Sequence, residues 1–245
     1  MTKIDILKNI ILNSKHLVFF GGAGVSTASK IPDFRSSNGI YNEKYGTIPI
    51  ETIISHSFFM SNPEIFYNVY KEKLCFPNAQ PNDCHLVLAK LEKMGILKSI
   101  ITQNIDDLHE KAGSKNILKL HGSVTSNHCM KCSKQFGLSY ILNSKGLPLC
   151  DNCKGLVKPD VVLYEEPLDY STVEKAISEI SKADTLIIGG TSLVVYPAAY
   201  YIEYFKGKNL VIINMSETSK DKECTLVIHD DIAKVFRELD IWLTP

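Results

Sequence analysis

The stretch HLVFFGGAGVSTASKIPDFR, residues 16–35, decides how the rest of the chain can fold. Leu17 to Phe20 is a wholly apolar run, typical of a strand buried on both faces, and it leads directly into a glycine-rich turn. Gly22 and Gly24 tolerate backbone angles that other residues avoid, so a phosphate can approach the chain closely here. A helix beginning near Val25 would direct its free N–H groups at that phosphate. The stretch therefore predicts a dinucleotide site, although Thr27 replaces the third glycine of the usual G-x-G-x-x-G pattern.

The residues that follow this turn are more specific than the turn itself. Pro32 interrupts the helical pattern, and Asp33, Phe34 and Arg35 then place an acid, an aromatic ring and a guanidinium side by side. A turn, a core phenylalanine or a surface ion pair could explain any one of them. Their occurrence together beside a phosphate turn indicates that they contact a ligand.

The composition narrows the class of protein. The chain has 245 residues, enough for one large domain or for a large domain with a smaller insertion. Lysine plus arginine equals aspartate plus glutamate at 27 each, so no global charge favours nucleic acid or an anionic membrane. No apolar stretch approaches the roughly 20 residues of a membrane span, and Asp5 and Lys8 interrupt the N-terminus where a signal peptide would be apolar. We therefore expect a cytoplasmic protein with no membrane partner and no direct nucleic-acid partner.

Strands and helices alternate along the rest of the chain. Amphipathic helices are expected at the N-terminus, after Asn82, after Leu168 and at the C-terminus. Buried strands are expected at residues 97–102, 117–120, 158–164, 183–188, 209–214 and 224–228. This alternation on both sides of a cysteine-containing segment predicts an α/β fold, with one Rossmann-like parallel sheet interrupted by an insertion.

Polar residues follow two of the central strands, at the sheet edge where parallel α/β folds bind ligands. Gln103, Asn104 and Asp106 come directly after residues 97–102, and His121 follows the next strand. Alternatively, Asn104 or Asp106 caps the next helix, and a lone histidine is more often structural than catalytic. The position of His121 at a strand end before a glycine favours a role as an acid or base.

Two later strands also end in candidate ligand contacts. The strand at residues 183–188 leads into Gly190-Thr191-Ser192, a second turn of the phosphate-binding type. The strand at residues 209–214 ends in Asn214, whose side chain could bond a ribose or a base.

The cysteines give the strongest spacing signal. Cys129 and Cys132 form one Cys-x-x-Cys pair, and Cys150 and Cys153 form a second pair seventeen residues further on. Two such pairs are the pattern of a tetrahedral Zn²⁺ held by four thiolates. Four protein ligands leave no open coordination position, so the zinc is expected to be structural. Disulfides are the alternative, which a reducing compartment does not favour.

In this order, the motifs resemble those of the sirtuin family over nearly the whole chain. The matching segments are Gly22-Ala-Gly-Val-Ser26 with Lys30-Ile-Pro-Asp-Phe-Arg35, Thr102-Gln-Asn-Ile-Asp106, His121-Gly122, the four paired cysteines, Lys158-Pro-Asp-Val-Val162, Gly190-Thr-Ser-Leu-Val-Val195 with Pro197-Ala198, and Ile213-Asn214.

The resemblance implies a domain division and an activity. Residues 1–35, 75–122 and 158–245 would form the Rossmann-like NAD-binding domain, and residues 36–74, a helical module, and 123–157, the zinc ribbon, would form a small domain. The family consumes NAD⁺ to remove acetyl groups from protein lysines, giving free lysine, nicotinamide and O-acetyl-ADP-ribose. The implied partners are acetyl-lysine proteins or peptides, with nicotinamide as product and inhibitor.

The resemblance also assigns roles to residues. It implies that His121 is the general base and that Asn104 and Asp106 complete the catalytic group, while Ile31, Phe34 and Ile105 wall a dry nicotinamide site. Its contacts with NAD are Gly22, Ala23, Gly24, Thr27, Asp33, Phe34, Arg35, Gln103, Asn104, Ile105, Asp106, His121, Gly190, Thr191, Ser192, Asn214 and Ile232. Its contacts with the substrate peptide, which would add as a strand, are Val162, Tyr164, Glu165, Val194 and Val195.

Three positions depart from the family pattern. Lys30 stands where the family usually has glycine, and Tyr164-Glu165-Glu166 replaces Phe-Gly-Glu, which would place a carboxylate at the substrate cleft. Tyr67 and Tyr70 occupy the positions of a Tyr-x-x-Arg motif found in members that remove acidic acyl groups. Without that arginine a succinyl or malonyl carboxylate lacks its ion-pair partner, so we expect a preference for acetyl or other neutral acyl groups.

Two other classes of function fit parts of the pattern. An NAD-dependent dehydrogenase with a structural zinc would share the glycine turn and the sheet, but it gives no reason for residues 31–35. A zinc-ribbon module could bind ADP-ribose or nucleic acid without turnover, but His121 with Asn104 and Asp106 argues against an inactive site. ADP-ribosyl transfer on the same machinery is a side activity that the sequence leaves open.

Overall fold

The structure, a computed structural model, describes residues 1–37 and 39–243. Its centre is a six-stranded sheet in the order β11-β10-β9-β1-β4-β5, and all of its strand pairs are parallel. The strands are β1 (Leu17–Gly21), β4 (Leu97–Thr102), β5 (Ile117–Lys119), β9 (Thr185–Gly189), β10 (Asn209–Ile213) and β11 (Leu226–Ile228). β1 and β9 lie at the centre and are buried along their whole length, because their side chains are apolar on both faces. The α/β, Rossmann-like fold expected from the sequence is confirmed.

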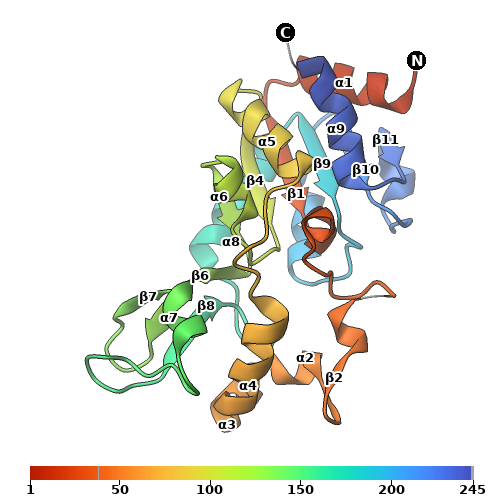
Figure 1. The fold of residues 1–245 in the computed structure, drawn as a ribbon. Coiled ribbons are helices and arrows are strands. Elements are labelled where there is room, and N and C mark those ends of the chain that lie inside the picture. The colour runs from red at the N-terminus through yellow and green to blue at the C-terminus, as the bar shows by residue number, and fades with distance from the viewer. Residues whose placement is uncertain (38, 244–245) are drawn as a thin grey trace.

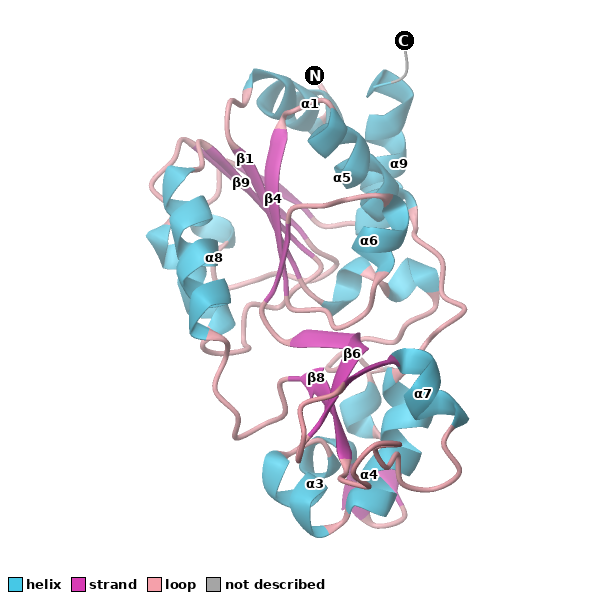
Figure 2. Cartoon of the chain, turned by 90° about the vertical axis from the view of Figure 1, so that its left-hand side faces the viewer, coloured by secondary structure: helices cyan, strands magenta, loops and turns pink. Residues whose placement is uncertain are grey.

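Helices cover both faces of this sheet (Figure 2). On one face lie α1 (Lys3–Asn13), α5 (Asp83–Lys93), α6 (Leu108–Ala112) and α9 (Ile232–Leu243), and their buried side chains pack with Phe19 and Ile100. On the other face lie α8 (Tyr170–Lys182) and the 3₁₀ helix η5 (Ala198–Tyr204), which pack with Phe20 and Ile101. Among the described residues, no helix has the length and apolar character needed to cross a membrane.

A second, smaller group of elements lies beyond the carboxyl ends of the sheet strands (Figure 1). We call residues 36–74 and 122–161 together the small lobe. Residues 36–74 contain η3 (Ile40–Asn42), β2 (Lys44–Tyr45), β3 (Ile48–Pro49), α2 (Ile50–Ile53), α3 (His56–Ser61), α4 (Pro63–Val69) and the π-helical turn η4 (Tyr70–Leu74). Residues 122–161 contain β6 (Gly122–Cys129), β7 (Gln135–Gly137), α7 (Leu138–Asn143) and β8 (Val157–Val161), with an antiparallel sheet in the order β7-β6-β8. The two segments share one core, in which Phe66 and Tyr70 lie with Val124, Ile141 and Val157.

The pairing of β8 bears on the domain boundary. β8 pairs with β6, with Cys129 opposite Val157 and Gly122 opposite Val161, and it makes no pair with the parallel sheet. The division into a Rossmann-like domain and a small domain remains our proposal. We now place the end of the zinc-ribbon part of the small domain at residue 161 instead of residue 157.

The prediction of a helix beginning near Val25 is wrong. The chain forms two 3₁₀ turns there, η1 (Ala23–Val25) and η2 (Thr27–Ser29), and the second ends at Lys30 with a left-handed φ of 65°. The backbone N–H of Gly24 donates to the carbonyl of Gly190 at 2.8 Å, which fixes the turn against a neighbouring loop. The turn is therefore shaped by a tertiary contact that local sequence does not contain.

Candidate functional site

A cavity of about 710 Å³ lies where the carboxyl ends of the sheet strands meet the small lobe. The sheet side contributes Gly24 and Thr191, and the small lobe contributes Ile54, Leu74 and Val161. Most of the residues predicted for the site line it, namely Ala23, Gly24, Thr27, Asp33, Phe34, Arg35, Gln103, Asn104, Ile105, His121, Val162, Tyr164, Glu165, Gly190, Thr191, Ser192, Val195, Asn214 and Ile232. Side chains from seven separate segments of the chain are therefore brought to one cleft, as the ligand rule for parallel sheets predicts.

Four predicted residues do not line this cavity: Gly22, Ile31, Asp106 and Val194. Val194 is 55% exposed and lies outside it. Asp106 lines a small adjoining pocket of about 40 Å³. Gly22 lies behind the wall, where an added Cβ would come within 2.7 Å of the Thr191 Cβ.

The two glycine turns hold each other. The N–H of Gly22 donates to Gly189 at 3.0 Å, and Gly190 has a φ of 58°. A Cβ on Gly190 would come within 2.4 Å of the Val25 nitrogen, so a side chain is excluded both by backbone angle and by space. These glycines are needed for the approach of one turn to the other, and their role in contacting a phosphate stays a prediction.

His121 is fixed by its backbone partner. Its Nδ1 lies 2.9 Å from the carbonyl oxygen of Gln103. Because a carbonyl can only accept, Nδ1 carries the proton of the neutral ring, and Nε2 keeps its lone pair. Burial lowers the pKa of His121, the Gln103 carbonyl opposes this shift, and the Arg35 charge adds to it. The ring is thus held neutral and oriented, which is what a general base requires.

Asn104 and Asp106 are joined through a residue that the sequence analysis missed. Asn104 donates from Nδ2 to the Ser26 hydroxyl at 3.0 Å, and Ser26 donates to Asp106 Oδ2 at 2.8 Å. The other Asp106 oxygen accepts from the Leu108 N–H at 3.0 Å, so Asp106 also caps the following turn, as the alternative interpretation expected. Burial raises the pKa of Asp106, and its hydrogen bonds from Leu108 and Ser26 oppose that shift. The only sequence signal for Ser26 was its place in the Gly-Ala-Gly-Val-Ser turn.

The small pocket beside Asp106 is mostly apolar. Ile31, Pro32, Phe34 and Ile105 form its dry walls, and Ser26, Asn104 and Asp106 are among its polar atoms. Phe34, Asn104 and Ile105 also line the large cavity, so the two spaces adjoin. The pocket can therefore take a flat apolar ring that carries a polar amide.

The remaining polar groups of the cleft suit a dinucleotide. Gln103 is buried, and its Nε2 has no hydrogen-bond partner among the described residues. Asp33 accepts from the N–H groups of Arg35 and Ser36, which fixes the loop after Pro32. An unpaired buried donor beside a guanidinium is a feature that NAD⁺, with its phosphates and ribose hydroxyls, would satisfy.

The carboxylate predicted for the substrate edge lies in the lining of the cavity. Glu165, with φ 76°, accepts from the Ser57 N–H at 2.8 Å and the Ser57 hydroxyl at 2.9 Å, both on α3. The carboxylate is therefore anchored to the small lobe, and its influence on the substrate stays a prediction. The Val162 N–H donates to the His121 carbonyl, whereas the Val162 carbonyl and the Glu165 N–H have no partner within the described ranges.

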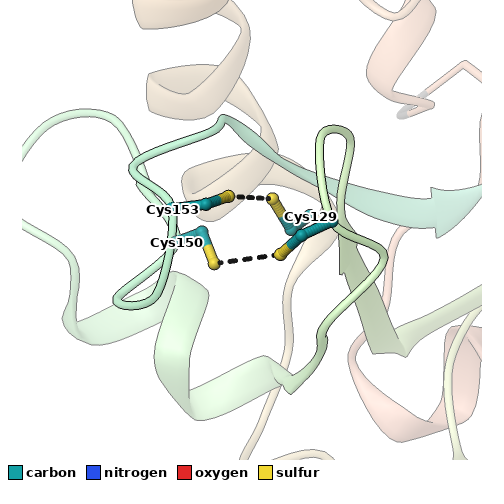
Figure 3. A group of neighbouring side chains, drawn as sticks. Cys129, Cys150 and Cys153 are labelled. Atoms are coloured by element: carbon teal, nitrogen blue, oxygen red, sulfur yellow. Dashed lines mark hydrogen bonds between the residues drawn. The ribbon is translucent and has the colours of Figure 1, made fainter.

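The four cysteines meet at one point of the small lobe (Figure 3). The sulfurs of Cys129 and Cys153 lie 3.4 Å apart and those of Cys132 and Cys150 lie 3.7 Å apart, with all four within 4.8 Å. A tetrahedral ZnS₄ site with bonds of about 2.3 Å places its sulfurs about 3.8 Å apart, so the cluster fits one structural Zn²⁺. Although desolvation opposes it, hydrogen bonds from the N–H groups of Cys132 and Lys131 lower the pKa of the Cys129 thiol to about 6. The thiolate form that zinc requires is therefore favoured at Cys129, whereas, although a backbone hydrogen bond at Gly155 opposes the shift, burial and the neighbouring thiols raise the pKa of Cys153 to about 12.

The sequence analysis missed several residues that line the cavity. Ile54 and Leu74 reach the cavity from the small lobe, Leu168 from the linker before α8, and Met215 and Asp230 from the loops after β10 and β11. Apolar residues in irregular segments cannot be recognised as site residues from the sequence. Asp230 at a strand end had the same signal as Asn214.

Comparison with known proteins agrees with this geometry. The sequence model of the Sir2 family matches residues 22–197. An NAD-dependent protein deacetylase of Clostridium perfringens is 62% identical over 95% of this chain and 96% of its own length, and one of Clostridium acetobutylicum is 55% identical over 96% and 97%.

Solved Sir2 structures share the fold over almost the whole chain. One, with a deacetylated p53 peptide and 3′-O-acetyl-ADP-ribose, has a TM-score of 0.89 and 39% identity and covers 98% of both chains. Another, with a p53 peptide and NAD⁺, has a TM-score of 0.87 and 38% identity, covering 99% of this chain and 98% of the other. The chain therefore belongs to the Sir2 family, the sirtuins.

Proposed function

We propose that this protein is an NAD⁺-dependent protein-lysine deacetylase, which converts acetyl-lysine and NAD⁺ into free lysine, nicotinamide and O-acetyl-ADP-ribose. The observation that carries the proposal is His121, oriented by the Gln103 carbonyl, kept neutral by burial, and placed in a cavity that both the sheet and the small lobe line. Relatives named NAD-dependent protein deacetylase span almost the same length, which supports it further.

We assign three tasks to the chain's own residues. NAD⁺ supplies a ribose carbon that carries a cationic leaving group. Asn104 and Asp106, linked through Ser26, hold the carboxamide of nicotinamide in the small pocket, and Phe34 shields that pocket from water. His121 accepts a proton at Nε2 from a ribose hydroxyl, because its Nδ1 is already committed to Gln103.

The substrate would be an acetylated protein or peptide. Its backbone would add beside residues 162–165, where the Val162 carbonyl and the Glu165 N–H are the groups left to pair with a strand. Tyr67 and Tyr70 are buried in the core of the small lobe, and Arg35 is the only cationic lysine or arginine side chain among the described residues lining the cavity. We therefore keep the preference for acetyl or other neutral acyl groups. The reduced zinc thiolates favour a cytoplasmic location.

The deciding assay measures nicotinamide release from NAD⁺ with and without an acetyl-lysine peptide, for the wild type and for His121→Ala. We expect release to require the peptide, to match the deacetylated product, and to fall by at least about 100-fold in the variant. A succinyl-lysine peptide of the same sequence should react more slowly than the acetyl peptide.

The other outcomes separate the alternatives. Release without any peptide would indicate NAD⁺ hydrolysis or ADP-ribosyl transfer. No release under any condition would overturn the proposal, and faster turnover of the succinyl peptide would overturn the acyl preference alone.

A further inference from the structure

One hydroxyl group joins the two sides of the cleft. Tyr164 lies in the linker between β8 and α8, on the side expected to bind the substrate, and its ring and backbone line the cavity. Its Oη lies 2.7 Å from the Oη of Tyr41, and it accepts a hydrogen bond from Arg35 Nη2 at 3.2 Å. Arg35 and Tyr41 both belong to the segment that follows Pro32 on the expected cofactor side.

The Arg35 guanidinium is held by aromatic residues and not by an acid. Its carbon lies 5.0 Å from the centre of the Tyr41 ring, in cation–π contact. Among residues 1–37 and 39–243, Tyr164 is the only group that accepts a hydrogen bond from this guanidinium, and no carboxylate pairs with it. Most of its five N–H donors are therefore left to an anionic ligand, while one contact sets its direction.

The segment around Arg35 is attached to the small lobe mainly by the packing of Phe34 and Tyr41 on its core and by the ion pair of Glu43 with Lys73. The Ile40 and Tyr41 N–H groups donate to the carbonyls of Asp33 and Phe34, so these bonds stay within the segment. The buried side chain of Ile40 anchors its far end in the small lobe. Burial and the Tyr164 hydroxyl raise the pKa of Tyr41, so its phenol keeps its proton at ordinary pH.

We propose that Tyr164 is a positioning residue whose hydroxyl holds Arg35 and Tyr41 in the orientation that receives the phosphates of NAD⁺. This inference rests on the proposed function. Replacement of Tyr164 by phenylalanine keeps the ring in the cleft wall but leaves Arg35 without its acceptor and the half-buried Tyr41 hydroxyl without its partner. The variant should then bind NAD⁺ less tightly, because ordering the segment around Arg35 costs free energy each time that NAD⁺ binds.

The test compares Tyr164→Phe with the wild type in two measurements. Hydrogen exchange of the ligand-free protein should show faster exchange in residues 33–37 and 39–43 of the variant. Steady-state kinetics should show the KM for NAD⁺ raised about tenfold, and any rise in the KM for the acetyl-lysine peptide should be smaller, because the variant keeps the ring and backbone of Tyr164 at the substrate edge.

Two further variants sharpen the result. Tyr41→Phe should give a smaller rise in the KM for NAD⁺, because it removes only the hydrogen bond between the two hydroxyls and leaves the one from Arg35 to Tyr164. The double variant should be no worse than Tyr164→Phe alone, which already removes both bonds. Tyr200→Phe, an exposed tyrosine outside the cavity, is the matched control and should change neither measurement.

Unaltered exchange, an unaltered KM for NAD⁺, or an equal rise in the peptide KM would each overturn the positioning role. Hydrogen exchange does not depend on turnover. If the wild type proves inactive, the proposed function fails, whereas unaltered exchange in an active enzyme refutes only the role of Tyr164.

Discussion

At the scale of single residues, the site depends on groups whose hydrogen-bonding capacity is already partly used. His121 offers one nitrogen because Gln103 holds the other, and Asp106 serves both Ser26 and the Leu108 N–H. Each such residue is restricted to one orientation before any ligand arrives. This restriction is what separates a catalytic histidine from a satisfied structural one.

The pH dependence of the reaction should reveal the state of His121. Burial lowers the pKa of His121 below its ordinary 6.5, so the neutral base persists to lower pH than for a free histidine. We expect kcat/KM to fall on the acid side, with the midpoint of that limb below about pH 6.5. Circular dichroism at each pH distinguishes this limb from unfolding, and a midpoint above neutrality in folded protein would contradict the assignment of His121 as the base.

At the scale of elements, the sequence correctly predicts the strands that are determined by a local pattern of apolar and polar residues. β1, β4, β9 and β10 were correct because continuous apolar runs bounded by glycines or polar residues leave little choice. The turn after Gly22 and the partner of β8 were missed because a contact with Gly190 and a pairing with β6 decide them. In the site, strand-end residues such as Asn104 could be predicted, whereas Ser26 and Leu74 depend on tertiary placement.

The folding of the zinc ribbon should depend on its bound metal. Removal of one thiolate by Cys132→Ser should reduce the zinc content from one equivalent to nearly none and destroy the cooperative melting of the small lobe, because metal binding contributes directly to folding. Metal analysis and thermal denaturation measure both effects. Cys224→Ser, outside the cluster, is the control, and a Cys132→Ser protein that retains a full equivalent of zinc would contradict the four-thiolate site.

At the scale of the whole molecule, a buried pair of histidines couples global stability to pH. His85 on α5 and His109 on α6 lie with their rings 4.7 Å apart beneath the sheet, and the His85 Nε2 and both His109 nitrogens lack a partner among the described residues. Burial lowers the pKa of His85 to about 4, and burial together with the charges of His85 and Lys119 lowers the pKa of His109 well below its ordinary 6.5. Both rings are thus neutral in the folded state.

The two buried histidines predict that acid lowers the free energy of unfolding. The unfolded chain binds protons near pH 6.5 and the folded chain does not, so the free energy of unfolding should fall as the pH drops through 6.5 towards about 4. The fall of the His85 pKa from 6.5 to about 4 corresponds to a loss on the order of 3 kcal/mol in the free energy of unfolding. Urea unfolding at a series of pH values tests it. His85→Gln should flatten the curve relative to His16→Gln, and two parallel curves would refute the assignment.

The shared core of the small lobe also has a consequence for biosynthesis. Its aromatic helix α4 is translated early, whereas the strands and the helix that cover it, β6, α7 and β8, follow only after most of the large sheet's first half has been made. At about 5–20 residues per second, the Phe66 and Tyr67 side chains would wait for seconds for the part of their core that β6, α7 and β8 supply. Completion of this lobe is therefore a late event, and chaperones that hold exposed aromatic segments would act on this chain before its second cysteine pair has left the ribosome.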